Sequence, residues 1–139
     1  MASTDDPMTV LVYSDDASTR NKIRLAVGRR PEPGLPRVDY IECATQPGVL
    51  DALGTGEVDV CVLDGEAAPS GGMGICRQIK DEVYRCPPVL VLIGRREDAW
   101  LATWSRADAV VPHPLAPVPV ARAVAELMRQ RLAASVATS

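Results

Sequence analysis

Carboxylates stand where two apolar stretches of the chain end, and they are the first candidates for chemistry. Asp64 follows the apolar residues 58–63, and Asp15 and Asp16 follow residues 8–13. An ionised carboxylate inside an apolar run needs a partner, whereas at the end of the run the chain meets water. Two neighbouring carboxylates repel each other unless a cation lies between them. If the fold brings them together, Asp64 and Asp15 are therefore expected to share a divalent cation.

Mg²⁺ is the cation that best suits these residues, because it takes one or two carboxylates, carbonyl oxygens and several waters. The expected ligands are Asp15, Asp64 and the backbone carbonyl of Glu66, with Asp16 as a further candidate. With Mg²⁺ bound, Asp64 could attack a phosphoryl donor as a nucleophile while the metal offsets charge on the transferred group. The alternative for Asp64 is a loop aspartate that starts a turn. For both aspartates, strand-end carboxylates without a metal stay an open alternative.

The elements that must position these residues alternate between strand and helix patterns. Strands are expected at residues 8–13, 37–43, 58–63, 88–93 and 107–112, and helices at residues 17–28, 46–53, 73–84, 96–105 and 117–132. This alternation predicts an α/β fold, a doubly wound five-stranded parallel sheet with helices on both faces. Right-handed crossovers favour the strand order 2-1-3-4-5, which makes the first and third strands neighbours. Asp15 and Asp64 would then lie at adjacent strand ends.

Length and composition indicate one domain at residues 8–132, with disordered tails at residues 1–7 and 133–139. The net charge of −3 over 139 residues argues against a nucleic-acid partner. No apolar run approaches the roughly 20 residues of a membrane span, and the polar N-terminus is unlike a secretory signal. A cytoplasmic protein is expected. The four cysteines form no CxxC pair and there is one histidine, so a zinc site of the usual spacing is not expected.

The order and spacing of these features resemble the receiver domain of bacterial two-component response regulators over residues 8–132. The matching features are residues 10–15 with Arg20 and Ile23, residues 60–64 with Pro69 and Gly72, residues 88–92, and residues 107–115. The resemblance implies Mg²⁺-dependent phosphoryl transfer to Asp64 from a histidine kinase or another phosphodonor. It also implies that the bond between His113 and Pro114 is cis, which suits a tight turn.

The resemblance further implies that a protein target binds the face made by the fourth helix, the fifth strand and the fifth helix. Trp100, Trp104 and Val110 are the residues that we assign to this face. The two tryptophans are four residues apart and share one side of a helix. We expect one of them to pack in the core and an exposed one to mark a docking surface.

Three residues depart from the pattern of the family. Ser14 replaces the first residue of the acidic pair, and Asp15 keeps the second. Ile93 occupies the place of the switch hydroxyl, and its side chain cannot hydrogen-bond a phosphoryl oxygen. His113 replaces the lysine before Pro114, and histidine is not a fixed cation at neutral pH. Each lost charge-assisted contact is worth about 1.5–3 kcal/mol.

The sequence therefore predicts an atypical stand-alone receiver with a degenerate switch, acting in signal transduction through protein–protein contacts. It is not expected to be an enzyme, beyond accepting a phosphoryl group onto Asp64, and it is expected to be a monomer or a weak homodimer. One alternative is a phosphorylation-independent binding module on the same fold. A weaker alternative is a small cofactor-binding flavodoxin-like protein, because no phosphate cradle is visible and Asp15 and Asp16 would repel a cofactor phosphate.

Overall fold

Strands and helices alternate along the chain in the computed structural model, which describes residues 6–68, 70–95 and 99–138. In chain order the elements are β1 (Met8–Tyr13), α1 (Ala17–Val27), β2 (Val38–Cys43), α2 (Gln46–Gly54), β3 (Val60–Asp64), α3 (Gly72–Glu82), β4 (Val89–Ile93), α4 (Ala99–Ser105), β5 (Ala109–Pro112) and α5 (Pro117–Thr138). Each predicted strand and helix is present, so the predicted alternation is confirmed.

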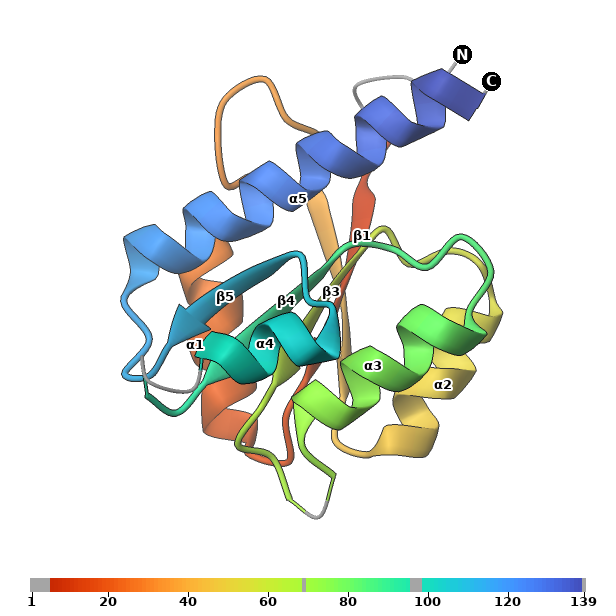
Figure 1. The fold of residues 1–139 in the computed structure, drawn as a ribbon. Helices are drawn as coiled ribbons and strands as arrows, with labels where there is room; N and C mark the ends of the chain where they lie inside the picture. The colour runs from red at the N-terminus through yellow and green to blue at the C-terminus, as the bar shows by residue number, and fades with distance from the viewer. Residues whose placement is uncertain (1–5, 69, 96–98, 139) are drawn as a thin grey trace.

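The strands form one parallel sheet in the order β2-β1-β3-β4-β5, as predicted (Figure 1). In this register Tyr13 at the end of β1 is opposite Leu63, and Asp64 at the end of β3 is opposite Leu92. The ends of β1 and β3 are therefore neighbours at the carboxyl edge of the sheet. In open parallel α/β sheets this edge, at the point where the strand order reverses, is where ligand sites are built.

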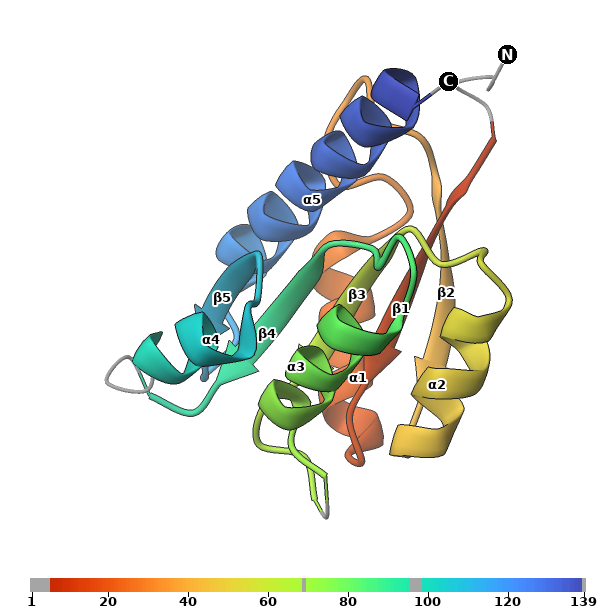
Figure 2. The ribbon, with the colours of Figure 1, turned by 45° about the vertical axis from the view of Figure 1, so that its right-hand side comes forward.

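Helices cover both faces of the sheet, with α1 and α5 on one side and α2, α3 and α4 on the other (Figure 2). Successive residues of β1 alternate between the two cores. Val10 and Val12 pack with α1 and α5, whereas Leu11 and Tyr13 pack with α2 and α3. Every residue of β3 is buried, which is typical of a central strand covered on both faces. This burial fixes the position of Asp64 at the strand end.

The expected end of the last helix changes. The α5 helix continues to Thr138, so the expectation of a disordered tail at residues 133–139 is wrong for residues 133–138. The segment 133–138 contains three alanines and neither glycine nor proline, and such a composition favours continuation of a helix. Residue 139 and residues 1–5 of the expected N-terminal tail lie outside the described residues, as does the expected start of α4 at residues 96–98. None of the described helices has the length and apolar character needed to cross a membrane.

Candidate functional site

Asp64 is the last residue of β3, and only 4% of it is exposed. Two glycines fix the backbone around it. A Cβ on Gly65 would lie 2.5 Å from the carbonyl oxygen of Leu92, so only glycine fits where the chain leaves the strand. A Cβ on Gly72 would lie 2.8 Å from the carbonyl carbon and oxygen of Asp64 itself. The close approach of α3 to the strand end thus holds Asp64 in place.

Hydrogen-bond donors already surround the Asp64 carboxylate. The Ser14 hydroxyl donates to Oδ2 over 2.8 Å, and the backbone N–H of Glu66 donates to Oδ1 over 2.9 Å. The His113 ring nitrogen Nε2 lies 3.4 Å from the same Oδ1. These three residues come from the loops that follow β1, β3 and β5. The fold therefore brings Ser14 and His113, two of the departures from the family pattern, directly to the candidate acceptor.

Ser14 is fully buried, and the surrounding backbone orients it. Its hydroxyl accepts a hydrogen bond from the backbone N–H of Asp16 over 3.1 Å. Its carbonyl accepts from Arg20 Nη1 over 2.6 Å, and Arg20 also pairs with Glu42 at 3.1 Å. Because the hydroxyl is held as an acceptor by Asp16, its proton is directed toward Asp64. Ser14 is thus held by its surroundings in the orientation that donates a hydrogen bond to the candidate acceptor.

Asp15 and Asp16 have different environments. Burial raises the pKa of the Tyr13 hydroxyl, and the charges of Asp15 and Asp64 add to that shift. The charges of Asp15 and Asp64 therefore both act on the Tyr13 hydroxyl. Asp16 is the N-cap of α1, where its two carboxylate oxygens accept from the Ser18 N–H and the Thr19 hydroxyl. The side chain that we named as a further metal ligand is engaged in capping.

The oxygens at this corner fit Mg²⁺ by type, because carboxylates and carbonyls are its usual protein ligands. Asp15 and Asp64 supply carboxylates, and Glu66 supplies a backbone carbonyl. Across the described ranges, however, no three side chains of Asp, Glu, His or Cys converge as a metal site. The Ser14 hydroxyl also occupies Oδ2 of Asp64, where a second carboxylate would otherwise share a cation. The donor set therefore offers Mg²⁺ two carboxylates and one carbonyl, and leaves the remaining positions to water.

The residues at the two expected switch positions lie at the same edge. Ile93 is the last residue of β4 and is buried in the core under α2 and α3. Its carbonyl accepts a hydrogen bond of 2.8 Å from the backbone N–H of His113. The bond between His113 and Pro114 is cis, as the resemblance implied. No hydroxyl extends from the Ile93 position toward Asp64, so any response to a group on Asp64 would have to involve other residues.

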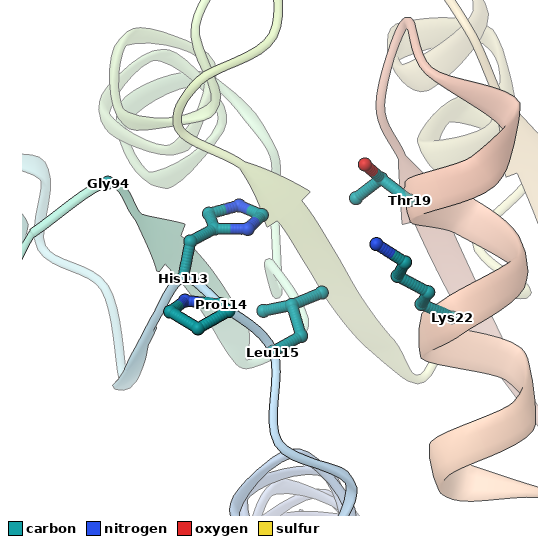
Figure 3. Close-up of a pocket in the computed structure, with 6 residues that line it drawn as sticks. All are labelled: Thr19, Lys22, Gly94, His113, Pro114 and Leu115. Carbon is teal, nitrogen blue, oxygen red and sulfur yellow. The ribbon is translucent and has the colours of Figure 1, made fainter.

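Sequence reasoning missed two features at this edge of the sheet. The first is the Glu66 side chain, which lies against Gly94, where any Cβ would overlap its carboxylate. The second is Lys22, which lines a cavity of about 450 Å³ together with Thr19, Gly94, His113, Pro114 and Leu115 (Figure 3). Thr19 and Lys22 are three residues apart on α1, so they share one side of the helix. That spacing was visible in the sequence, but the loop residues opposite them were not.

The predicted output face carries exposed aromatic area on α4. Trp100 and Trp104 are 68% and 49% exposed, so the expectation that one of them packs in the core is wrong. The guanidinium of Arg77 on α3 lies 4.7 Å from the ring centre of Trp104 and donates to its carbonyl over 2.7 Å. Val110 on β5 is half-buried beside the core. The tryptophans stay exposed because the short α4 turns them outward while α3 supports only one of them.

The chain is similar to known proteins along nearly all of its length. A protein described as an uncharacterized response regulatory protein of Mycobacterium tuberculosis, found in two strains, is 49% identical over 129 residues. This match covers 93% of the chain and 97% of the relative. The receiver domain of a Francisella response regulator has a TM-score of 0.72 at 20% identity, covering 90% of this chain and 98% of that one. The chemotaxis response regulator CheY4 of Vibrio cholerae has a TM-score of 0.71 at 16% identity, covering 88% and 99%. No family model matches the chain.

Proposed function

Because this chain belongs to the response regulators and has the fold of their receiver domains, we propose that it is a signalling receiver with a reduced phosphorylation switch. The hydrogen bond from Ser14 to Asp64 is the observation that carries the proposal. It keeps the acceptor carboxylate in place but puts a neutral hydroxyl where a second carboxylate would strengthen cation binding. The output in this proposal is a protein–protein contact, and the location is the cytoplasm, where phosphodonors such as histidine kinases present their phosphoryl groups.

The acceptor step in this proposal uses Asp64. One of its carboxylate oxygens attacks the phosphorus of a phosphohistidine or of acetyl phosphate, and a new P–O bond forms as the bond to the leaving group breaks. The leaving nitrogen or oxygen takes the electron pair of the broken bond. The Glu66 N–H and the Ser14 hydroxyl orient the carboxylate for this attack. Mg²⁺ held by Asp15, Asp64 and the Glu66 carbonyl would supply positive charge to the transferred group.

Ile93 and His113 are the basis for a reduced switch. A hydroxyl that turns toward a phosphoryl oxygen can couple phosphorylation to movement of the neighbouring loop, and the Ile93 side chain has no such group. His113 lies 3.4 Å from Asp64 and is 28% exposed, so it is near the acceptor but supplies a cation only when protonated. We therefore propose that phosphorylation of Asp64, where it occurs, changes the target-binding face weakly.

The target-binding face in this proposal is the surface of α4 around Trp100 and Trp104. Exposed tryptophans are over-represented among the residues that dominate protein–protein binding energy. The stacked guanidinium of Arg77 holds Trp104 in one orientation, which lowers the ordering cost of a partner contact. This surface is present without any group on Asp64. A second candidate function, a binding module independent of phosphorylation, is favoured by the same observation.

Incubation with Mg²⁺ and acetyl phosphate, followed by intact-protein mass spectrometry, tests the acceptor. A gain of one phosphoryl group in the wild type and none in Asp64→Asn is expected. Tryptophan emission and backbone amide exchange of α4, recorded with and without the adduct, test the switch. A small change in α4 despite full phosphorylation is expected. A large change would contradict the reduced switch, and the lack of any adduct would leave the binding module as the function.

A further inference from the structure

We propose that Lys22 on α1 is the cationic group that binds a phosphoryl group carried by Asp64. This inference rests on the proposed function, because it names a residue that holds the transferred group. The site it assigns is the cavity between α1 and the loops after β4 and β5. The ligand class is a tetrahedral phosphoryl group or an analogue of the same shape and charge.

Lys22 and His113 line the same cavity, and His113 is next to the acceptor Asp64. His113 lines the cavity wall opposite α1, and its Nε2 lies 3.4 Å from Oδ1 of Asp64. Figure 3 shows the Lys22 side chain extending from α1 across the opening toward His113 and Leu115. The cavity volume of about 450 Å³ leaves room for a phosphoryl group and water between these walls. Lys22 and His113 thus line one opening, and His113 contacts the acceptor carboxylate from its edge.

The charges around Asp64 call for a fixed cation. A phosphoryl group brings about −1.5 to −2 charges at neutral pH. The charges of Asp15 and Asp64 act on the same Tyr13 hydroxyl, and the Glu66 carboxylate lies against Gly94 on the cavity wall. The Asp15 and Glu66 side chains would repel the added charge. The Mg²⁺ proposed at Asp15 and Asp64 would offset part of this charge, and a protein cation on the cavity side would offset more.

Lys22 is the available cation in the part of the chain that the structure describes. Both arginines of the same helix are already engaged, Arg20 with the Ser14 carbonyl and Glu42 and Arg24 with Glu42. Among the described residues, Lys22 makes no ion pair or hydrogen bond, so its ammonium is free to bind a ligand. A lysine ammonium has three donors on a flexible stem and binds phosphate as a point charge.

Beryllofluoride and acetyl phosphate are the probes for the test, because each places a tetrahedral anion on the acceptor carboxylate. Fluorine NMR gives the apparent affinity of the beryllofluoride adduct, and intact mass gives the lifetime of the phosphoryl adduct. The variants are Lys22→Met, which removes the charge, and Lys22→Arg, which keeps it. Arg29→Met is the matched control, because it removes one charge from an exposed residue just after α1, outside the cavity.

Lys22→Met is expected to weaken the adduct by about three- to tenfold, as for one partly screened charge contact. Lys22→Arg is expected to restore most of the loss, and Arg29→Met is expected to match the wild type. The difference between wild type and Lys22→Met is also expected to shrink at high salt. A stable adduct that is equally strong in Lys22→Met would overturn the inference while leaving the proposed function intact. A wild type that forms no adduct with either probe would overturn both.

Discussion

The buried hydroxyl of Ser14 donates a 2.8 Å hydrogen bond to Oδ2 of Asp64 across the pair of strands β1 and β3. This bond joins the two carboxyl ends that the strand order brings together. It satisfies one oxygen of a carboxylate that is almost fully buried, and it does so without a second negative charge. One neutral hydroxyl therefore satisfies the buried carboxylate oxygen without adding charge to the site.

Ser14→Asp is expected to make stability depend on Mg²⁺. Without Mg²⁺ a carboxylate at this buried position faces Asp64 and costs about 3 kcal/mol, because it is an uncompensated buried charge. With Mg²⁺ the two carboxylates share the cation, and binding to the folded state recovers the loss. Thermal unfolding with and without Mg²⁺ measures both effects. Ser14→Ala is the control, expected to lose about 1–3 kcal/mol with no recovery by Mg²⁺. Equal Mg²⁺ shifts in wild type and Ser14→Asp would contradict the role assigned to the hydroxyl.

His113→Lys is expected to strengthen the adduct on Asp64 about tenfold, the value of one charge-assisted hydrogen bond. The new ammonium would extend from the position where the His113 ring now lies 3.4 Å from the carboxylate. Beryllofluoride titration of the folded protein measures the change. His113→Gln keeps a polar side chain without a fixed charge and should bind like the wild type. If the lysine variant bound beryllofluoride no more tightly than the glutamine variant, the lack of a fixed positive charge at His113 would not be what limits the adduct.

Two glycines of α3 offer a matched test of the packing that holds Asp64. A Cβ on Gly72 would lie 2.8 Å from the Asp64 carbonyl carbon, whereas a Cβ on Gly74 would meet nothing within 4 Å. Gly72→Ala is expected to destabilise the protein by about 1–3 kcal/mol through overpacking. Gly74→Ala is expected to stabilise it by about 0.5–1 kcal/mol, since alanine is the better helix former. Urea unfolding compares the two variants. Similar stabilities of the two variants would mean that the packing of α3 against Asp64 at Gly72 is not close enough to exclude a Cβ.

Alkaline pH is expected to lower stability through Tyr40. Burial raises the pKa of its hydroxyl to about 12, against an opposing effect of Arg24. An unfolded tyrosine loses its proton near pH 10, so the stabilisation is complete below that pH and is lost as the pH rises toward about 12. Urea unfolding across this range measures how the free energy of unfolding changes with pH. Tyr40→Phe should show a smaller change than the wild type. Parallel slopes in both proteins would assign the pH dependence to other groups.

The layered fold could be predicted from the sequence because its signals are local. Each strand is an apolar run, each helix has an apolar stripe, and their alternation allows few topologies. The end of α5 was mispredicted because Leu132 closes the apolar stripe, although the alanines that follow still favour a helix. Helix propensity therefore favours the continuation of α5 beyond Leu132.

The candidate site could be predicted only in part. Asp64 and Asp15 were found because strand ends are visible in the sequence. The bond from Ser14 to Asp64 depends on strand register to within one residue, and the pairing of Glu66 with Gly94 depends on how two loops cross. Lys22 was missed because an exposed helix lysine has no distinguishing pattern. Contacts between loops are set by tertiary packing, which residue types and spacing do not encode directly.

The placement of the aromatic residues on α4 has a practical consequence for spectroscopy. The chain has two tryptophans, and both lie on this one helix, with Trp104 stacked against Arg77 from α3. Intrinsic tryptophan emission therefore reports on α4 and is insensitive to changes in most of the sheet. Quenching by a docked protein would be visible with no added dye, while loss of order at the far edge around β2 would pass almost unseen.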